Sequence, residues 1–298
     1  MPAPLRLGLA GAGKWGRNFI RTIAGIGELR LARIASRNPQ TPELAPPGCR
    51  VVEDWRDLMD ASAVDGVIVA TPPASHAEIA RAAILAGIPV LIEKPLALSS
   101  ADARAIRDLA IERKVLALVD HTHLFSPAFR ALKALAARHG GVREIHSEAG
   151  NHGPYRPDVS VLWDWGPHDV AMCLDLMQEA PASAACTVRD RSPRDGGVAE
   201  TVSIALSFPS GVPAQILLSN TTDKTRRFRV RCADAELVYD DLSPHRLLVD
   251  GTPVALGADL PLTVAVREFA GAIAAGDWDR SSLDLGVGVV EVLEGCAR

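Results

Sequence analysis

Residues 5–16 read LRLGLAGAGKWG, an apolar run that ends in glycines spaced as G-x-G-x-x-G. The run 5–10 has the length and composition of a buried strand, and residues 15–26 show the apolar spacing of a helix. In this setting Gly11 permits a tight turn, Gly13 lets backbone approach a pyrophosphate, and Gly16 lets the helix lie close to the strand. The stretch predicts the first βαβ unit of a dinucleotide-binding fold. The alternative is a glycine-rich turn of structural use only.

The predicted cofactor turn also includes Lys14 and Trp15, and the next strand, residues 29–36, ends in Ser36-Arg37. An NAD site usually carries Asp or Glu about 20 residues beyond the glycine motif, where it holds the ribose 2′-hydroxyl. Here that place is taken by Ser36, and the guanidinium of Arg37 suits a 2′-phosphate. NADP is therefore favoured and NAD remains possible. The alternative for Arg37 is a solvated loop residue.

Strand and helix patterns alternate through the first 119 residues, which predicts a doubly wound parallel sheet with right-handed crossovers. Thr71, Pro72 and His76 follow the predicted strand 64–70 and are expected to line the cofactor site. For His76 the alternative is packing in the first turn of the next helix. Ser75 and Glu78 have the spacing of a capping box there.

A charged pair, Glu93-Lys94, leaves the short apolar run 89–92, and a helical pattern follows from residue 101 to 112 after Ser99-Ser100. Open α/β sheets bind ligands at the carboxyl ends of their strands. Lys94 is therefore a candidate to present an ammonium to a ligand, with Glu93 beside it at the cofactor site. The alternative is an ordinary surface ion pair between the two.

The length of 298 residues predicts about two domains, and 48% hydrophobic residues with a net charge of −4 indicate a soluble globular chain. A net charge of −4 does not indicate a basic surface for nucleic-acid binding. No apolar run approaches the roughly 20 residues that span a membrane. The first residues lack a secretory signal. Five scattered cysteines without a Cys-x-x-Cys pair favour reduced thiols in the cytoplasm and argue against disulfides and a zinc or other metal site.

Several motifs together resemble the glucose–fructose oxidoreductase / inositol dehydrogenase / rhizopine-catabolism family. They are the glycine motif, TPP at 71–73, EKP at 93–95, FSPAF at 125–129 and DWGPH at 164–168. The likeness runs from Leu5 to about Tyr239. It implies an α/β Rossmann domain followed by an α+β domain with an open, mostly antiparallel sheet. Two departures are the short chain and residues 160–163, SVLW, which replace the Gly-Gly usual before the Asp.

The second half of the chain independently reads as an α+β domain. Alternating strand patterns bounded by turn residues occur at 142–149, 184–189, 199–208, 213–220, 226–232, 235–239 and 246–249. Helical patterns occur at 127–138, 164–177, 262–275 and 283–296. The predicted domains are residues 1–122 for the cofactor and 123–298 for the substrate. Too few helices follow to cover both faces of the second sheet, so an apolar face is expected to join a homodimer or homotetramer.

Asp164 and His168 stand four residues apart with Pro167 between them. Asp164 at the N-cap of a helix would place Pro167 at the third helical position and His168 one turn above. The alternatives are a simple capping carboxylate and a histidine bonded to a neighbouring loop. Beside a dinucleotide site both become candidates for catalysis, because a histidine near a helix N-terminus favours the neutral form that accepts a proton.

The family resemblance implies that Lys94, Asp164 and His168 are catalytic. Lys94 would stabilise oxyanion charge, His168 would exchange the hydroxyl proton, and Asp164 would orient the substrate or the imidazole. The expected substrate is a sugar, nucleotide sugar or cyclic polyol, with no membrane or nucleic-acid partner. Plausible pocket-wall residues are His121, His123, Asn151, His152 and Tyr155. Two other activities stay open, namely redox-assisted glycoside hydrolysis with recycled NAD and a non-catalytic cofactor-binding sensor or repressor.

Overall fold

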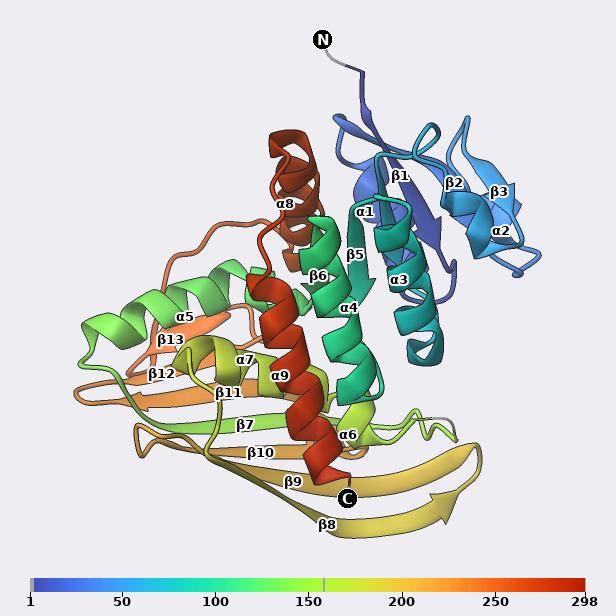
Figure 1. Cartoon of the computed structure of the whole chain (residues 1–298). Coiled ribbons are helices and arrows are strands. Elements are labelled where there is room, and N and C mark those ends of the chain that lie inside the picture. The colour runs from blue at the N-terminus through green and yellow to red at the C-terminus, as the bar shows by residue number, and fades with distance from the viewer. Residues whose placement is uncertain (1–2, 158, 298) are drawn as a thin grey trace. The chain divides into compact units, whose positions relative to one another are not determined.

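The computed structural model describes residues 3–157 and 159–297, and its elements are labelled in Figure 1. The chain divides into two compact units. The first unit comprises residues 1–121 and 260–290, and the second comprises residues 122–259 and 291–298. The predicted boundary at residue 122 therefore lies one residue from the observed one. The assignment of residues 260–290 to the second domain is wrong, because this segment contacts the first unit.

The first unit holds a six-stranded sheet in the order β3-β2-β1-β4-β5-β6 among its described residues. Every neighbouring pair is parallel, so all strands end at the same edge. This order is that of a doubly wound dinucleotide-binding sheet, and it confirms the predicted Rossmann architecture. The strands are β1 (Leu5–Ala10), β2 (Leu29–Ala35), β3 (Arg50–Val52), β4 (Gly66–Val69), β5 (Val90–Glu93) and β6 (Ala117–Asp120).

Helices cover this sheet on both faces. Helix α8 packs beside α1 and against the sheet, where Phe269 and Ile273 meet Gly66, and helices α3 and α4 pack together against the other strands. The return of α8 to the sheet explains the domain correction. The helices of this unit are α1 (Gly16–Ala24), α2 (Thr41–Leu44), α3 (His76–Leu85), α4 (Ser100–Arg113), α8 (Pro261–Ala275) and the first part of α9 (Ser281–Cys296). Short 3-10 turns occupy Trp55–Leu58 (η1) and Pro73–Ser75 (η2).

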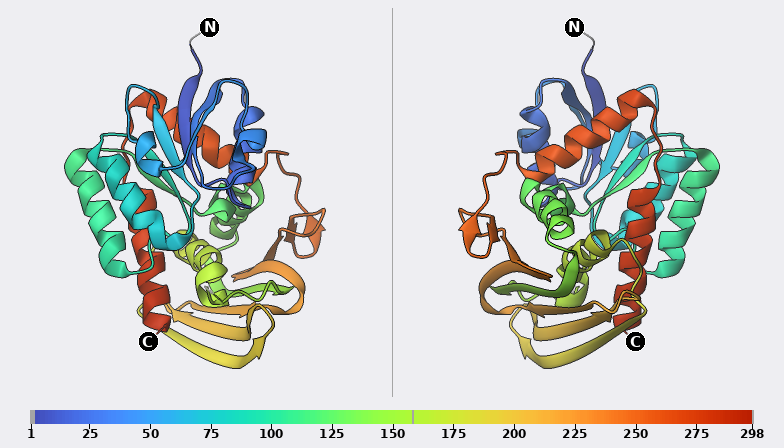
Figure 2. Two further views of the ribbon diagram at one scale, coloured as in Figure 1. Left: turned by 90° about the vertical axis from the view of Figure 1, so that its right-hand side faces the viewer. Right: turned by 90° about the vertical axis from the view of Figure 1, so that its left-hand side faces the viewer.

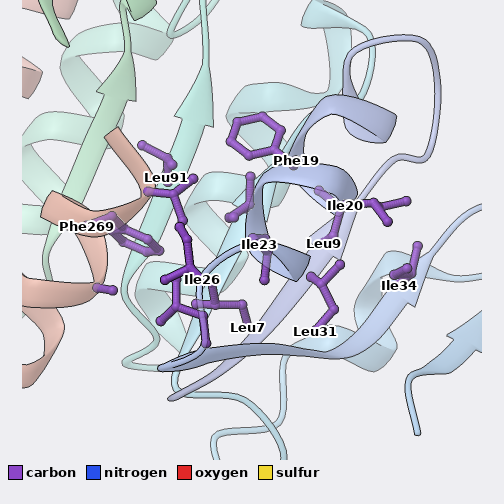
Figure 3. Close-up of a cluster of buried hydrophobic side chains, with 14 of the residues drawn as sticks. Leu7, Leu9, Phe19, Ile20, Ile23, Ile26, Leu31, Ile34, Leu91 and Phe269 are labelled. Atoms are coloured by element: carbon purple, nitrogen blue, oxygen red, sulfur yellow. The ribbon is translucent and has the colours of Figure 1, made fainter. Parts of the chain in front are cut away.

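A buried hydrophobic cluster joins α1 and α8 to the sheet (Figure 3). Phe19, Ile20 and Ile23 of α1 recur at helical spacing and pack with Leu7 and Leu9 of β1. Burial of this kind stabilises the fold by about 25 cal/mol for each Å² of apolar surface removed from water. The apolar residues whose spacing predicted a helix after β1 are therefore the residues that α1 buries against the sheet.

The two predicted helix starts have different outcomes. The side chain of Ser99 accepts a hydrogen bond from the Asp102 amide at 3.1 Å, so Ser99 caps α4. The capping box at Ser75 is wrong, because the Ser75 hydroxyl instead donates to Thr71 Oγ1 at 2.7 Å and the Ser75 side chain makes no cap bond. Glu78 pairs with Arg56 at 2.9 Å.

The second unit holds an eight-stranded sheet in the order β14-β13-β12-β11-β7-β10-β9-β8 among its described residues. All neighbours are antiparallel except β7 and β10, which confirms the predicted open, mostly antiparallel sheet. The strands are β7 (Val142–His152), β8 (Ser183–Arg194), β9 (Gly197–Ser207), β10 (Pro213–Ser219), β11 (Thr221–Cys232), β12 (Glu236–Asp240), β13 (Leu247–Val249) and β14 (Thr252–Pro253). Its helices are η3 (Thr122–Phe125), α5 (Pro127–Arg138), α6 (Val161–Asp164) and α7 (Gly166–Met177).

The two faces of this second sheet differ in character. Helices α5 and α7 lie on one face (Figure 2), where they contact β12, β10 and β7. The other face carries charged rows on β7, β11 and β12, and Arg231 and Arg227 pair there with Glu144 and Asp240. The expectation of an apolar outer face is therefore wrong for these strands, because their buried apolar residues all belong to the helix-covered side.

The helices of the described chain are too short or too polar to cross a membrane.

Replacement of Gly16 by Ala should destabilise the chain. A Cβ at this position would lie 2.1 Å from the carbonyl oxygen of Gly11, so α1 has to move away from β1. We expect a loss of about 1–3 kcal/mol in unfolding free energy, measured by urea denaturation. Gly13→Ala is the matched control, because its Cβ would meet nothing within 4 Å and should change stability by no more than about 0.5 kcal/mol. Equal stability of both variants would contradict this account of the turn.

Candidate active site

The turn after β1 leaves room for a ligand at one glycine. Gly11 has φ +96°, and a Cβ there would lie 2.6 Å from the carbonyl oxygen of Ala70, so the turn itself requires this glycine. A Cβ on Gly13 would instead meet nothing within 4 Å. The neighbouring Lys14 and Trp15 are exposed. This open space at the start of α1 lies where the sequence predicts the pyrophosphate of a dinucleotide.

The end of β2 separates the roles of the two residues singled out there. The Ser36 hydroxyl accepts hydrogen bonds from the Asn38 amide at 3.1 Å and the Thr41 hydroxyl at 2.9 Å, so Ser36 shapes the turn. The side chain of Arg37 is exposed. The Arg37 guanidinium therefore faces solvent. The hydrogen bonds that shape the turn are made by Ser36.

His76 joins two loops at the carboxyl edge of the first sheet. Its ring nitrogens lie 2.8 Å from the carbonyl oxygens of Thr71 and Pro95. Burial lowers the pKa of this imidazole, and the charge of Lys94 lowers it further. Because both nitrogens face backbone, His76 ties the loop after β4 to the loop after β5, and its ring serves packing rather than direct polar contact with a cofactor.

Four polar side chains gather where β5 and β6 end. Glu93 and Asp120 are register partners and are buried at 5% and 0% exposure. Burial raises the pKa of Glu93 well above its ordinary value, and the neighbouring Asp120 raises it further. His121 is also buried, and burial together with the Lys94 charge lowers its pKa to about 3. Glu93 is buried, so it does not form an ordinary surface ion pair with Lys94, and Lys94 lies beside a histidine whose pKa burial holds low.

The second unit brings His123 and His168 together. Their rings meet edge to face at 5.1 Å between centroids, and His123 Nδ1 lies 2.8 Å from the Tyr239 hydroxyl. That hydroxyl donates to Asp241 at 3.2 Å, so its oxygen accepts the hydrogen of His123 Nδ1. Burial raises the pKa of Tyr239, and the Asp241 charge raises it further. His123 is thus held through Nδ1 with its ring against His168.

Asp164 does not cap the helix that carries His168. It is the last residue of α6, and α7 begins at Gly166 with Trp165 at its N-cap and no side-chain cap bond. The predicted N-cap position of Asp164 is therefore wrong, and His168 is the third residue of α7. Asp164 Oδ2 lies 3.6 Å from Nη1 of Arg156, a partner that sequence spacing did not indicate.

Two buried carboxylates that the sequence analysis missed fix the helices under Asp164 and His168. Glu200 of β9 accepts a 2.6 Å hydrogen bond from the Val161 amide, the first residue of α6. Asp169 of α7 accepts a 2.5 Å hydrogen bond from the Ser147 hydroxyl and lies 3.3 Å from Nη1 of Arg226. The sequence holds one indication that Asp169 is buried and paired, because this acidic residue lies inside the apolar run of α7.

The other predicted substrate residues lie near the end of β7. Asn151 and His152 form its last two residues rather than a loop, and His152 pairs with Asp223 at 3.4 Å. Tyr155 follows, with its backbone near the turn between β8 and β9 at Gly196. Among the predicted substrate residues, His123 therefore contacts His168. His152 instead pairs with Asp223, and Tyr155 lies near Gly196.

A pocket of about 310 Å³ opens in the second unit at the start of α5. Its wall includes Ser126, His245, Arg246 and Asp259. Arg246 lies 3.8 Å from Asp241, which in turn accepts the hydroxyl hydrogen of Tyr239. The pocket is thus linked through side chains to the His123–His168 pair.

Two family models match most of the chain. Residues 5–121 match an oxidoreductase family with an NAD-binding Rossmann fold, and residues 129–238 match the GFO/IDH/MocA C-terminal domain. A crystal structure of an oxidoreductase from Magnetospirillum magnetotacticum MS-1 is 46% identical, covers 99% of this chain and 100% of that one, and superposes with a TM-score of 0.94.

Two characterised relatives are more distant. Inositol 2-dehydrogenase of Rhizobium meliloti is 28% identical over 235 residues, which is 74% of this chain and 70% of that protein. UDP-N-acetylglucosamine 3-dehydrogenase of Acidithiobacillus ferrooxidans is 27% identical over 247 residues, which is 80% of this chain and 75% of that protein.

Replacement of Asp169 by Ala should be strongly destabilising. It leaves Arg226 and the Ser147 hydroxyl without their buried partner, for which we expect a loss of about 3–5 kcal/mol in unfolding free energy. Asp175→Ala on the same helix is the control, because its partner Lys133, at 2.9 Å, is part-exposed and the pair is worth about 0–1 kcal/mol. Urea denaturation compares the two, and similar losses would show that Asp169 does not anchor α7.

Proposed function

Because the chain belongs to the GFO/IDH/MocA family of oxidoreductases, we propose that it moves hydride between a nicotinamide cofactor and a carbinol carbon of a sugar-like substrate. The observation that carries this proposal is the position of Lys94. It lies at the carboxyl end of β5, in the same parallel sheet whose first turn leaves space for a pyrophosphate over Gly13. Bound nicotinamide would supply or accept the hydride.

The residues of the chain divide the remaining work. Lys94 stabilises negative charge on the reacting oxygen, because an ammonium in a protected site is worth more than in water. His168 exchanges the hydroxyl proton, with its ring supported by His123, whose Nδ1 is held by Tyr239. Asp164 orients the substrate hydroxyl or the imidazole.

We favour a nucleotide-linked sugar within the sugar and polyol class. The pocket at the start of α5 has room beyond a single sugar ring, and Arg246 offers a guanidinium suited to phosphate. Inositol and nucleotide-sugar dehydrogenases both stand among the relatives, so the class itself follows from the family. Arg246→Ala should raise KM for nucleotide sugars and leave KM for free sugars or inositols unchanged.

Assembly and compartment are further parts of the proposal. We propose a homodimer or homotetramer formed through the outer face of the second sheet, where rows of arginine and acidic side chains that pair within the chain could exchange partners with a second copy. Such a contact should weaken with salt. Light scattering at low and high salt tests this, and a monomer at micromolar concentration under both conditions would contradict it. The free cysteines support a cytoplasmic setting.

The function is tested by a screen of sugars, nucleotide sugars and inositols for change in absorbance of the reduced cofactor, followed by variants. His168→Ala should lower turnover by about 10²–10⁴ with cofactor binding nearly intact. Lys94→Ala should also lower turnover, through lost charge stabilisation. Asp164→Asn should keep stability and lose most activity. Full activity of His168→Ala would overturn the mechanism.

Product and cofactor analysis separates the three activities that this cofactor site could serve. A dehydrogenase accumulates reduced or oxidised cofactor in step with product. A glycoside hydrolase that recycles NAD cleaves the substrate with no net change in cofactor, and a sensor binds cofactor without turnover.

NADP should bind more tightly than NAD. The end of β2 offers the exposed guanidinium of Arg37 to a 2′-phosphate and has Ser36 where a carboxylate would repel it. Calorimetry on wild type and Arg37→Ala checks this, with Arg56→Ala as a control for loss of a nearby exposed arginine. Equal affinity for both cofactors, unchanged in Arg37→Ala, would show that NADP is not preferred.

A further inference from the structure

Two buried carboxyl groups meet at the ends of β5 and β6. Glu93 and Asp120 are the last residues of these parallel strands and stand in direct register. Register partners in neighbouring strands point to the same face of the sheet. Both side chains are buried, so the register places two carboxyl groups side by side out of contact with water.

A hydrogen bond between two carboxyl groups requires a proton. An ionised carboxylate only accepts hydrogen bonds, so one partner has to be protonated to donate. Two adjacent buried negative charges would also repel, and burial disfavours the second charge further. Both effects favour a pair that carries one proton and one negative charge.

The surroundings show what this single charge balances. The Lys94 amide donates to Glu93 Oε2 at 3.2 Å, and the Lys94 ammonium acts electrostatically on Glu93. Burial and the Lys94 charge lower the pKa of the nearby His121 to about 3, so this imidazole adds no charge near neutral pH. Lys94 is thus the cation that acts on the carboxyl pair at this end of the sheet.

We propose that Glu93 and Asp120 share one proton and act as a positioning dyad, whose single negative charge holds the ammonium of Lys94 at the carboxyl end of β5. Two negative charges would bind the ammonium more tightly and reduce its effect on a substrate oxygen. No negative charge would leave a part-buried cation without compensation. The positioning role rests on the proposed function of Lys94, whereas the shared proton does not.

Amide variants separate a shared proton from two separate charges. Glu93→Gln and Asp120→Asn each replace the shared proton by a fixed N–H donor, so each keeps one hydrogen bond and one negative charge. The double variant keeps no charge. We expect the double variant to lose at least about tenfold more turnover than either single variant. Additive losses would mean that both carboxylates are ionised, which overturns the dyad.

A second measurement needs neither substrate nor cofactor. In the unfolded chain Glu93 ionises around its ordinary pKa of 4.5, whereas the native pKa lies well above that value. Native protein then binds one proton more, so its stability is complete below pH 4.5 and is lost as the pH rises toward the native pKa. In that window the folding equilibrium constant of wild type should fall by about tenfold per pH unit relative to each single variant.

Urea denaturation at a series of pH values upward from 4.5 measures this slope. Asp65→Asn is the matched control, because bonding to Arg6 lowers the pKa of Asp65 and keeps it ionised throughout, so this variant should parallel wild type. A wild-type slope equal to both single variants overturns the shared proton. A slope lost in Glu93→Gln but kept in Asp120→Asn also overturns it, because the proton would then belong to Glu93 alone.

The two proposals fail in different ways. If no sugar is turned over, the proposed function and the role of Lys94 fall together, while the pH slope still decides the shared proton. If turnover exists and the double variant matches wild type, the positioning role is overturned whatever the slope shows. If the double variant does not fold, the single variants and their pH slopes decide.

Discussion

The close approach of Gly11 and Gly16 is the constraint on which the first unit depends. A side chain at Gly16 would lie within 2.1 Å of the Gly11 carbonyl oxygen, so α1 keeps its place only with glycine there. That place sets the packing of α1 on β1 and β2, and it opens the space over Gly13. Because the strands that follow are all parallel, the same sheet edge gathers Lys94, Glu93 and Asp120.

The second unit positions its candidate catalytic residues by a different means. Helices α6 and α7 have no side-chain caps, and buried carboxylates of Glu200 and Asp169 anchor them to the sheet instead. A buried charge is costly to desolvate, and its partners offset that cost only when the geometry is good. The anchors therefore tolerate little movement, which suits helices that carry Asp164 and His168.

Charge balance around Lys94 links fold to chemistry. A cation that stabilises developing negative charge has to remain charged without an excess of negative charge in its own surroundings. Burial keeps His121 neutral, and the proposed proton sharing between Glu93 and Asp120 limits the nearby negative charge. The sequence motif at residues 93–95 indicates only a charged pair. The charge that Glu93 carries depends on Asp120, which lies beside it on β6.

Local patterns in the sequence determined the strands, most helices, the glycine turn and the identity of Lys94, Asp164 and His168 as candidates. Strand and helix periods and turn chemistry act over a few residues, so they can be read along the chain. Tertiary structure alone decided the return of residues 260–290 to the first sheet, the pairing of His123 with His168, and the roles of Asp120 and Asp169. Asp169 meets partners 22 and 57 residues away, and no local period records such a contact. Whether a carboxyl group is charged depends on the neighbours that folding brings to it.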